Sequence, residues 1–162
     1  MKVEQRRWEP SSGWSQPISG KLEEIAQLVL CFGGSALVST PQTFEKLKQL
    51  YPSSHILLCS SAGEILNTTV TDNSMVATAV YFNKTSLQFA QTEISQAEDS
   101  YDAGKKLAGQ LPTQDLVHAM VFSDGLHING TALVKGLTEI LPGSVSVTGG
   151  LVETAVILST LM

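Results

Sequence analysis

The stretch LVHAMVFSDGLHINGTALVKGLTEILPGSVSVTGG, from Leu116 to Gly150, carries the strongest fold signal in the chain. Leu116–Phe122 is apolar except for His118, and the turn-forming residues Ser123–Gly125 follow it directly. A short apolar run that ends in turn residues is typical of a buried strand. We therefore predict a strand over Leu116–Phe122.

A helix and a second strand are predicted next. Apolar residues repeat at helical spacing over Thr131–Leu141, Pro142 stops the helix, and Val145–Val147 restarts an extended run. Strand, helix and strand in this order form a βαβ unit, whose ligands collect beyond the carboxyl ends of the strands. The residues at these predicted ends are Ser123, Asp124, Gly125, Thr148, Gly149 and Gly150.

Two interpretations of these residues remain open. Ser123 and Asp124 offer a hydroxyl and a carboxylate to a ligand ammonium, but Asp-Gly after a strand is also an ordinary turn in which Asp caps its own backbone. Gly149 and Gly150 permit either close approach of a ligand to the backbone or a tight turn. The sequence does not separate a binding role from a structural one here.

The first half of the chain predicts the same order of strand, helix and strand. Leu28–Phe32 and His55–Cys59 are the predicted strands, and Pro41 begins the helix between them, with Thr40 as its N-cap. The loop after the second strand adds four candidate ligand-binding residues: Ser60, Ser61, Gly63 and Glu64. Hydroxyl and amide groups suit a ligand carboxylate, and Glu64 suits an amine, but a structural turn is an equal alternative.

The middle of the chain predicts an insertion. Met75–Phe82 and Leu87–Ile94 are extended runs that predict a β-hairpin. A helix capped by Asp99 or Ser100 then runs through Leu111.

The order of elements predicts an α/β fold with a mixed, mainly parallel sheet, helices on both faces and an inserted β-hairpin. In this fold, the loops at Ser60-Ser61, Ser123-Asp124 and Thr148-Gly149 lie at one end of one sheet. We assign residues 1–20 to an irregular N-terminal arm, because they are rich in turn formers and their apolar residues follow neither helical nor strand periodicity. Residues 21–151 are expected to form one α/β domain.

Composition limits the function classes. The formal net charge is -5 and no basic cluster occurs beyond Arg6-Arg7, so a nucleic-acid partner is not expected. Cys31 and Cys59 lie in apolar, strand-like runs and are predicted to be buried free thiols, which favours a cytoplasmic protein. No apolar run approaches the roughly 20 residues of a membrane helix, so neither a signal peptide nor a membrane partner is expected.

A hydrolase-like enzyme is the alternative from another function class. The residue types of a nucleophile, a base and an orienting carboxylate are present as Cys59 or Ser60, His127 and Asp124. The flanking residues lack the Gly-x-Ser-x-Gly elbow of hydrolases, so we expect no enzymatic activity. The spacing of His, Cys and carboxylate residues predicts no metal site, and we predict no cofactor.

Three motifs together resemble the N-terminal part of FIST domains: CSSAGEI at Cys59–Ile65, SDGLHINGTALVKGL at Ser123–Leu137 and VTGGL at Val147–Leu151. The resemblance runs from about Leu28 to Leu151. It implies a bacterial or archaeal sensory domain that binds a small ligand and signals to an output protein. Haem binding, described for some members, is implied by the resemblance only. We therefore predict a sensory domain in signal transduction whose ligand is an amino acid or a similar small polar molecule.

The residues after Leu151 depart from the family pattern, which usually continues well beyond this point. Residues 152–162 contain the apolar run AVILSTLM and are treated as a divergent tail. If the chain is a shortened family member, this run is expected to add a strand or helix to its own domain. If it is a truncated fragment, the ligand site is incomplete and the run invites association between chains.

Overall fold

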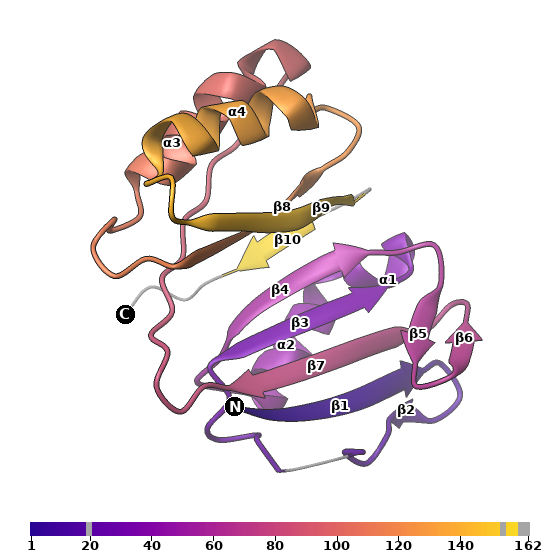
Figure 1. Ribbon diagram of the computed structural model, residues 1–162. Coiled ribbons are helices and arrows are strands. Elements are labelled where there is room, and N and C mark those ends of the chain that lie inside the picture. The colour runs from indigo at the N-terminus through magenta and orange to yellow at the C-terminus, as the bar shows by residue number, and fades with distance from the viewer. Residues whose placement is uncertain (19–20, 153–154, 159–162) are drawn as a thin grey trace. The chain divides into compact units, whose positions relative to one another are not determined.

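The computed structural model describes residues 1–18, 21–152 and 155–158 (Figure 1). The strands are β1 (Lys2–Glu9), β2 (Gly13–Trp14), β3 (Leu28–Gly33), β4 (His55–Ser60), β5 (Glu64–Leu66), β6 (Thr69–Thr71), β7 (Met75–Tyr81), β8 (His118–Asp124), β9 (Ser146–Val152) and β10 (Ala155–Leu158). The helices are α1 (Ser35–Val38), α2 (Pro41–Leu50), α3 (Ser100–Gly109) and α4 (Gly130–Ile140), with a 3₁₀ turn at Ala97–Asp99. The chain divides into two compact units: the first is Met1–Ser86 together with β10, and the second begins at Leu87.

The first unit is built on a six-stranded sheet with the strand order β10-β4-β3-β7-β1-β2. β3 and β4 are parallel, because α1 and α2 cross over between them, and the other neighbouring pairs are antiparallel. The sheet is therefore mixed and mostly antiparallel, and the prediction of a mainly parallel sheet is wrong. The physical reason is that β7 enters between β3 and β1 and β10 adds to the opposite edge. Apolar runs alone do not specify either position.

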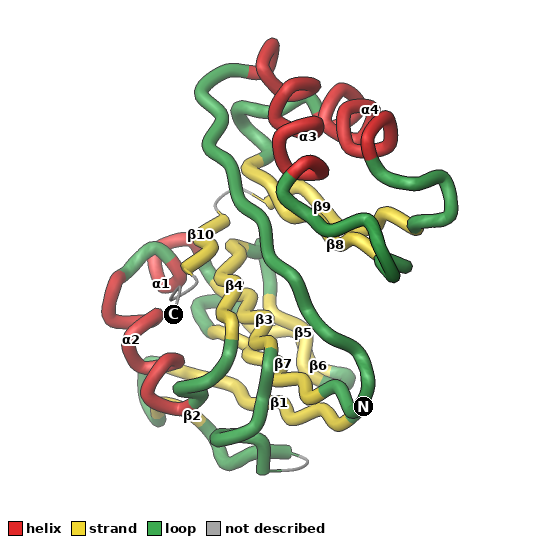
Figure 2. Tube along the Cα trace, turned by 90° about the vertical axis from the view of Figure 1, so that its left-hand side faces the viewer, coloured by secondary structure: helices red, strands yellow, loops and turns green. Residues whose placement is uncertain are grey.

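Helices cover one face of this sheet. α1 and α2 pack on that face (Figure 2), where Cys31, Leu47 and Tyr51 belong to a core of almost fully buried side chains. α2 begins at Pro41 with Thr40 as its N-cap, which confirms the predicted helix start. The helices among the described residues of this unit, α1 and α2, lie on one face, so the prediction of helices on both faces of the sheet is wrong here.

Residues 2–9 form β1 and not the irregular arm predicted from the sequence. The strand buries two charged side chains, Glu4 and Arg6. Glu4 Oε1 accepts hydrogen bonds from Arg6 Nε (2.8 Å) and Tyr51 OH (2.6 Å), and Oε2 accepts one from the Leu22 backbone N–H (2.6 Å). Because the charged groups satisfy each other inside the unit, β1 has a buried face that hydropathy does not reveal.

β7 is a central strand and not the first half of a long hairpin. Met75–Tyr81 pairs with both β1 and β3, and Leu87–Ile94 forms no strand. The predicted hairpin of Met75–Phe82 with Leu87–Ile94 is therefore wrong. The hairpin in this part of the chain is the short pair β5–β6, which precedes β7.

The second unit consists of the parallel strands β8 and β9, with α3 and α4 on one face (Figure 1). The predicted βαβ unit is confirmed as β8–α4–β9. The predicted strand over Leu116–Phe122 lies two residues further along, at His118–Asp124. The core of the second unit contains buried Ala108, Leu133 and Leu137, which come from α3 and α4.

Two glycines let α3 and α4 approach closely. A Cβ atom at Gly104 would lie 2.3 Å from the carbonyl oxygen of Leu133, and one at Gly136 would lie 2.0 Å from the carbonyl oxygen of Tyr101. Both distances are far shorter than any real contact of a Cβ atom. The helices therefore pack backbone against backbone at this crossing.

The apolar tail adds an edge strand to the first unit. Ala155–Leu158 forms β10, antiparallel to β4, with Ala155 opposite Cys59 and Leu158 opposite Ile56. This is the first of the two expected routes for the tail, in which it extends the sheet of its own chain.

Candidate functional site

The candidate residues are divided between the two units. The first unit holds Ser60, Ser61, Gly63 and Glu64, and the second holds Ser123, Asp124, Gly125, Gly149 and Gly150. Cys59 belongs to β4 in the six-stranded sheet, whereas Phe122 belongs to β8 in the two-stranded sheet. The prediction that the following loops lie at one end of one sheet is therefore wrong. Its physical reason is that β8 pairs with β9, while β4 is already paired on both sides, with β3 and β10.

Glu64 is a buried carboxylate with hydrogen bonds to its own unit. Its side chain is 2% exposed, and Oε1 accepts a hydrogen bond from Ser61 Oγ (3.0 Å). Oε2 accepts hydrogen bonds from the backbone N–H (3.3 Å) and the hydroxyl (2.8 Å) of Ser74. The Ser61 backbone N–H in turn donates to the carbonyl of Gly33 (2.9 Å). Glu64 and Ser61 thus hold the β5–β6 hairpin to the ends of β3 and β7, which supports the structural interpretation of this loop.

Cys59 and Ser60 at the end of β4 are buried as well. Cys59 is 1% exposed, and burial raises the pKa of its thiol to about 11. A thiol with this pKa carries almost no thiolate near neutral pH, and the thiolate is the nucleophilic form. The environment of Cys59 suits a core residue better than a nucleophile.

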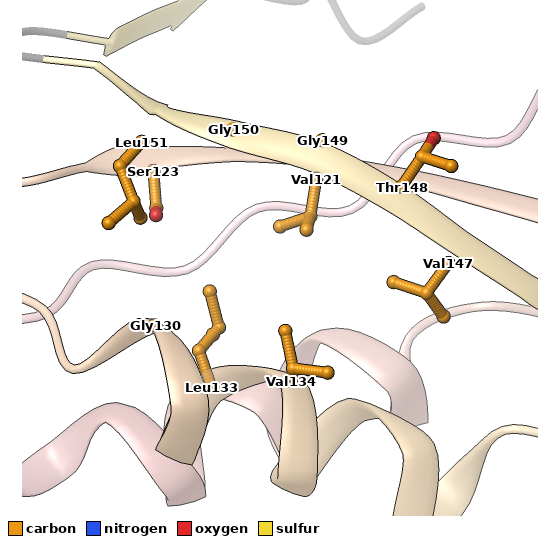
Figure 3. Close-up of a pocket in the computed structure, with 10 residues that line it drawn as sticks. All are labelled: Val121, Ser123, Gly130, Leu133, Val134, Val147, Thr148, Gly149, Gly150 and Leu151. Carbon is orange, nitrogen blue, oxygen red and sulfur yellow. The ribbon is translucent and has the colours of Figure 1, made fainter.

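The second unit contains a pocket of about 360 Å³ between α4 and the β8–β9 pair (Figure 3). The residues that line it are Val121, Ser123, Gly130, Leu133, Val134, Val147, Thr148, Gly149, Gly150 and Leu151. Figure 3 shows Val121 on the sheet and Leu133 and Val134 on the helix pointing toward one another across the pocket. None of the ten lining residues carries a charged side chain.

Ser123 and Thr148 are the lining residues with hydroxyl groups, but in Figure 3 the Thr148 side chain points away from α4 and out of the pocket. Thr148 Oγ1 lies 2.9 Å from His118 Nε2, with which it forms a hydrogen bond. In Figure 3, the Ser123 side chain points toward α4, and no hydrogen bond of its hydroxyl is found among the residues that the structure describes. Ser123 therefore supplies the pocket with a hydroxyl that is free to bind a polar group.

Gly149 brings the two strands close together beside the pocket. Its φ is +147°, and a Cβ atom at this position would lie 1.7 Å from the carbonyl oxygen of Val121. A side chain at Gly149 would therefore push β8 and β9 apart. By contrast, a Cβ atom at Gly150 would meet nothing within 4 Å.

Asp124 stabilises the turn after β8 and is not part of the pocket lining. Its Oδ1 accepts a hydrogen bond from the Leu126 backbone N–H (2.6 Å), and Oδ2 lies 3.0 Å from His127 Nδ1. The hydrogen bonds from His127 and then from Leu126 hold the pKa of Asp124 below its usual value. Gly125 donates its N–H to the carbonyl of Val152 (2.7 Å) and so joins this turn to the end of β9.

Sequence reasoning thus identified only part of the pocket. Three of the predicted candidates line it: Ser123, Gly149 and Gly150. The aliphatic lining residues were missed, because Val121, Leu133 and Val147 have the periodicity of ordinary core residues. One sequence feature could have indicated the pocket. Gly130 begins α4 after the turn that follows β8, and it is a lining residue.

Within residues 1–18, 21–152 and 155–158, His, Cys, Asp and Glu side chains do not gather in groups of three or more that could hold a metal ion. The helices in the same ranges are too short or too polar to span a membrane.

Comparison with known proteins gives one family. The family model of the FIST N domain matches residues 27–157, which is most of the chain. The match extends past Leu151, where the three quoted motifs end, and reaches β10. No curated protein and no solved structure matches the chain. The chain therefore belongs to the FIST N family, whose domains are sensory and signalling domains.

Proposed function

We propose that this FIST N domain is a sensory domain that binds a small ligand in the pocket between α4 and the β8–β9 pair. The observation that carries the proposal is the free Ser123 hydroxyl in an otherwise aliphatic pocket. Binding sites for small molecules are typically apolar concavities with a few placed polar groups. The volume of about 360 Å³ lies at the small end of the usual range, which suits a single small molecule.

The exposure of the pocket lining supports this role. Val134 on α4 is 45% exposed and Leu151 on β9 is 56% exposed, although both are large aliphatic residues. Covering them would gain about 25 cal/mol for each Å² of apolar surface removed from water. A ligand with an aliphatic part gains this energy when it binds.

We propose a small polar molecule as the ligand, and the amino acids are the first class to test. The polar group of the ligand accepts or donates a hydrogen bond at Ser123, and its aliphatic part contacts the aliphatic residues of α4 and β9. The Glu64 loop is not included in this site, because the Glu64 carboxylate is buried and already accepts three hydrogen bonds.

We propose binding without catalysis. The enzyme alternative requires Cys59 or Ser60 as a nucleophile, and burial keeps the Cys59 thiol protonated near neutral pH. His127 and Asp124 are paired, and that pair is explained by the turn after β8. A signalling output protein is the proposed partner. The buried free thiols of Cys31 and Cys59 favour the cytoplasm.

The experiment is a thermal-shift screen of the purified chain against the common amino acids. A ligand at about 100 times its Kd adds roughly 2.7 kcal/mol to the free energy of unfolding and raises the midpoint. The pocket variant is Val134→Phe, which fills the space between α4 and the sheet. Its matched control is Ile140→Phe on the same helix, where the side chain is 41% exposed and does not line the pocket.

We expect Val134→Phe to weaken binding by roughly tenfold or more, about 1.4 kcal/mol, because the larger side chain occupies space that the ligand needs. Ile140→Phe should bind like the parent chain. Equal binding by the parent chain and Val134→Phe would place the ligand elsewhere and refute the pocket.

A further inference from the structure

We infer that the pocket between α4 and β8–β9 selects an uncharged aliphatic molecule with one hydrogen-bonding oxygen, and that it does not need the ammonium or the carboxylate of an amino acid. This inference rests on the proposed function and specifies its ligand class. Three observations carry it. The pocket lining has no charged side chain, Asp124 and Lys135 have partners elsewhere, and Ser123 supplies one free hydroxyl.

A ligand ammonium has no anionic partner in the lining. Asp124 follows the pocket residue Ser123, but both of its carboxylate oxygens are held by the turn, one by Leu126 and the other by His127. The remaining lining groups are aliphatic side chains, the Ser123 hydroxyl and glycine backbone, since the Thr148 hydroxyl points away from α4. Moving an ammonium into such a site without a partner is costly, because its hydration is lost and no charge replaces it.

A ligand carboxylate has no cationic partner either. Neither lysine nor arginine contributes to the lining, and the lysine of α4, Lys135, has its Nζ 5.8 Å from the centre of the Tyr101 ring. A full negative charge in the pocket would therefore lose its hydration without forming an ion pair. An uncharged group avoids both costs.

One polar atom of the ligand does have a partner. Ser123 directs its hydroxyl toward the α4 side of the pocket, and a carbonyl or hydroxyl oxygen can accept its hydrogen bond. Gly130, the first residue of α4, lies in the same lining. The positive end of the helix dipole favours the partial negative charge of such an oxygen, and it supplements the Ser123 hydroxyl.

The test compares four molecules with one carbon skeleton and different charges. They are leucine, leucinamide, 4-methylpentanoate and 4-methylpentanamide, which carry respectively both charges, the ammonium only, the carboxylate only and neither. Isothermal titration calorimetry on the full chain measures each Kd at pH 7. We expect 4-methylpentanamide to bind most tightly and each added charge to weaken binding.

Variants of the chain then locate the polar contact. Ser123→Ala should weaken binding of 4-methylpentanamide by about fivefold, the size of one neutral hydrogen bond, and Ser123→Thr should restore most of it. The control is Ser146→Ala on β9, which is exposed and does not line the pocket.

The outcomes separate the inference from the proposed function. Tighter binding of leucine, leucinamide or 4-methylpentanoate than of 4-methylpentanamide overturns the inference and leaves the pocket as a ligand site. Equal loss of binding in Ser123→Ala and Ser146→Ala also overturns it. Failure of all four molecules, together with failure of the whole amino-acid panel, overturns the proposed function itself.

Discussion

Glu4 is a carboxylate that the first unit buries completely, with 0% exposure. Desolvation by itself raises the pKa of Glu4, but the hydrogen bonds from Tyr51, Arg6 and the Leu22 N–H outweigh it. The pKa of Glu4 is therefore below its ordinary value of 4.5 in the folded chain. These contacts join β1 to the segment before β3 and to the end of α2.

The lowered pKa predicts how stability depends on pH. Glu4 stabilises the fold fully above its unfolded pKa near 4.5, and this contribution is lost as the pH falls through its lower folded pKa. We expect Glu4→Gln to cost about 1.5–3 kcal/mol at pH 7, because Arg6 keeps its ion pair with Glu23 but loses its charged hydrogen bond to Glu4. The difference from the parent chain should shrink below about pH 4.5.

Tryptophan fluorescence during urea unfolding is the appropriate measurement, because both tryptophans of the chain, Trp8 and Trp14, lie in the first unit. Glu98→Gln removes an exposed carboxylate and serves as the control. A constant difference between Glu4→Gln and the parent chain from pH 7 to pH 3 would contradict the assignment.

Cysteine reactivity tests the enzyme alternative directly. Burial raises the pKa of the Cys59 thiol to about 11, and that of Cys31 is raised further. We expect neither thiol to react with iodoacetamide at pH 8 within minutes in the folded chain, and both to react in urea. Mass spectrometry counts the alkylated sites. Rapid, selective alkylation of Cys59 in the folded chain would revive the nucleophile interpretation.

The crossing of α3 and α4 depends on glycine at two positions. In Gly104→Ala the new methyl group meets the backbone of α4, and in Gly136→Ala it meets the backbone of α3. Since backbone cannot move aside as a side chain can, we expect each variant to lose about 1–3 kcal/mol or more. Gly109→Ala, in α3 with nothing within 4 Å, should instead gain up to about 1 kcal/mol from helix propensity.

Hydrogen exchange over α3 and α4 measures this effect in the second unit, where tryptophan is absent from the described residues. Faster exchange in Gly104→Ala and Gly136→Ala, but not in Gly109→Ala, is the expected pattern. Unchanged protection in all three would show that the helices are further apart than the structure places them.

Elements were predictable from the sequence where local signals were sufficient. Pro41 with Thr40 gave the start of α2, and the periodicity over Thr131–Leu141 gave α4 to within a residue. β1 was missed because its buried positions hold Glu4 and Arg6, whose mutual contacts depend on the tertiary structure. The partners of β7 were missed for a similar reason, since strand pairing over long sequence distances leaves no local pattern.

For the candidate site too, local signals were predictable from the sequence and tertiary contacts were not. Ser123, Gly149 and Gly150 were found from turn chemistry at the ends of predicted strands, and they line the pocket. Glu64 was selected for its charge, but its hydrogen bonds to Ser61 and Ser74 serve the fold. The sequence alone does not distinguish a charged loop residue that binds a ligand from one that accepts hydrogen bonds from its own fold.

The molecule consists of two units with separate hydrophobic cores. One core contains residues of the six-stranded sheet and of α1 and α2, and the other lies under α3 and α4. Length and composition favour a single core for a chain of 162 residues, but they carry no information on how buried residues are grouped. The grouping makes it possible to perturb each unit by itself, as the Glu4 and Gly104 variants do.

The edge strand β10 gives the last prediction, which concerns association of the whole molecule. β4 is flanked by β3 on one side and by β10 on the other, so deletion of residues 155–162 would expose the backbone N–H and C=O groups of β4. We expect this deletion to lower the stability of the first unit by roughly 2–4 kcal/mol, at about 1 kcal/mol for each lost ladder hydrogen bond. An unpaired edge also favours pairing between chains, so size-exclusion chromatography should show dimers or larger species. The matched control deletes only residues 159–162 and keeps β10, so the edge of β4 stays paired in the control. If the longer deletion is monomeric and equally stable, β10 does not protect the edge of β4.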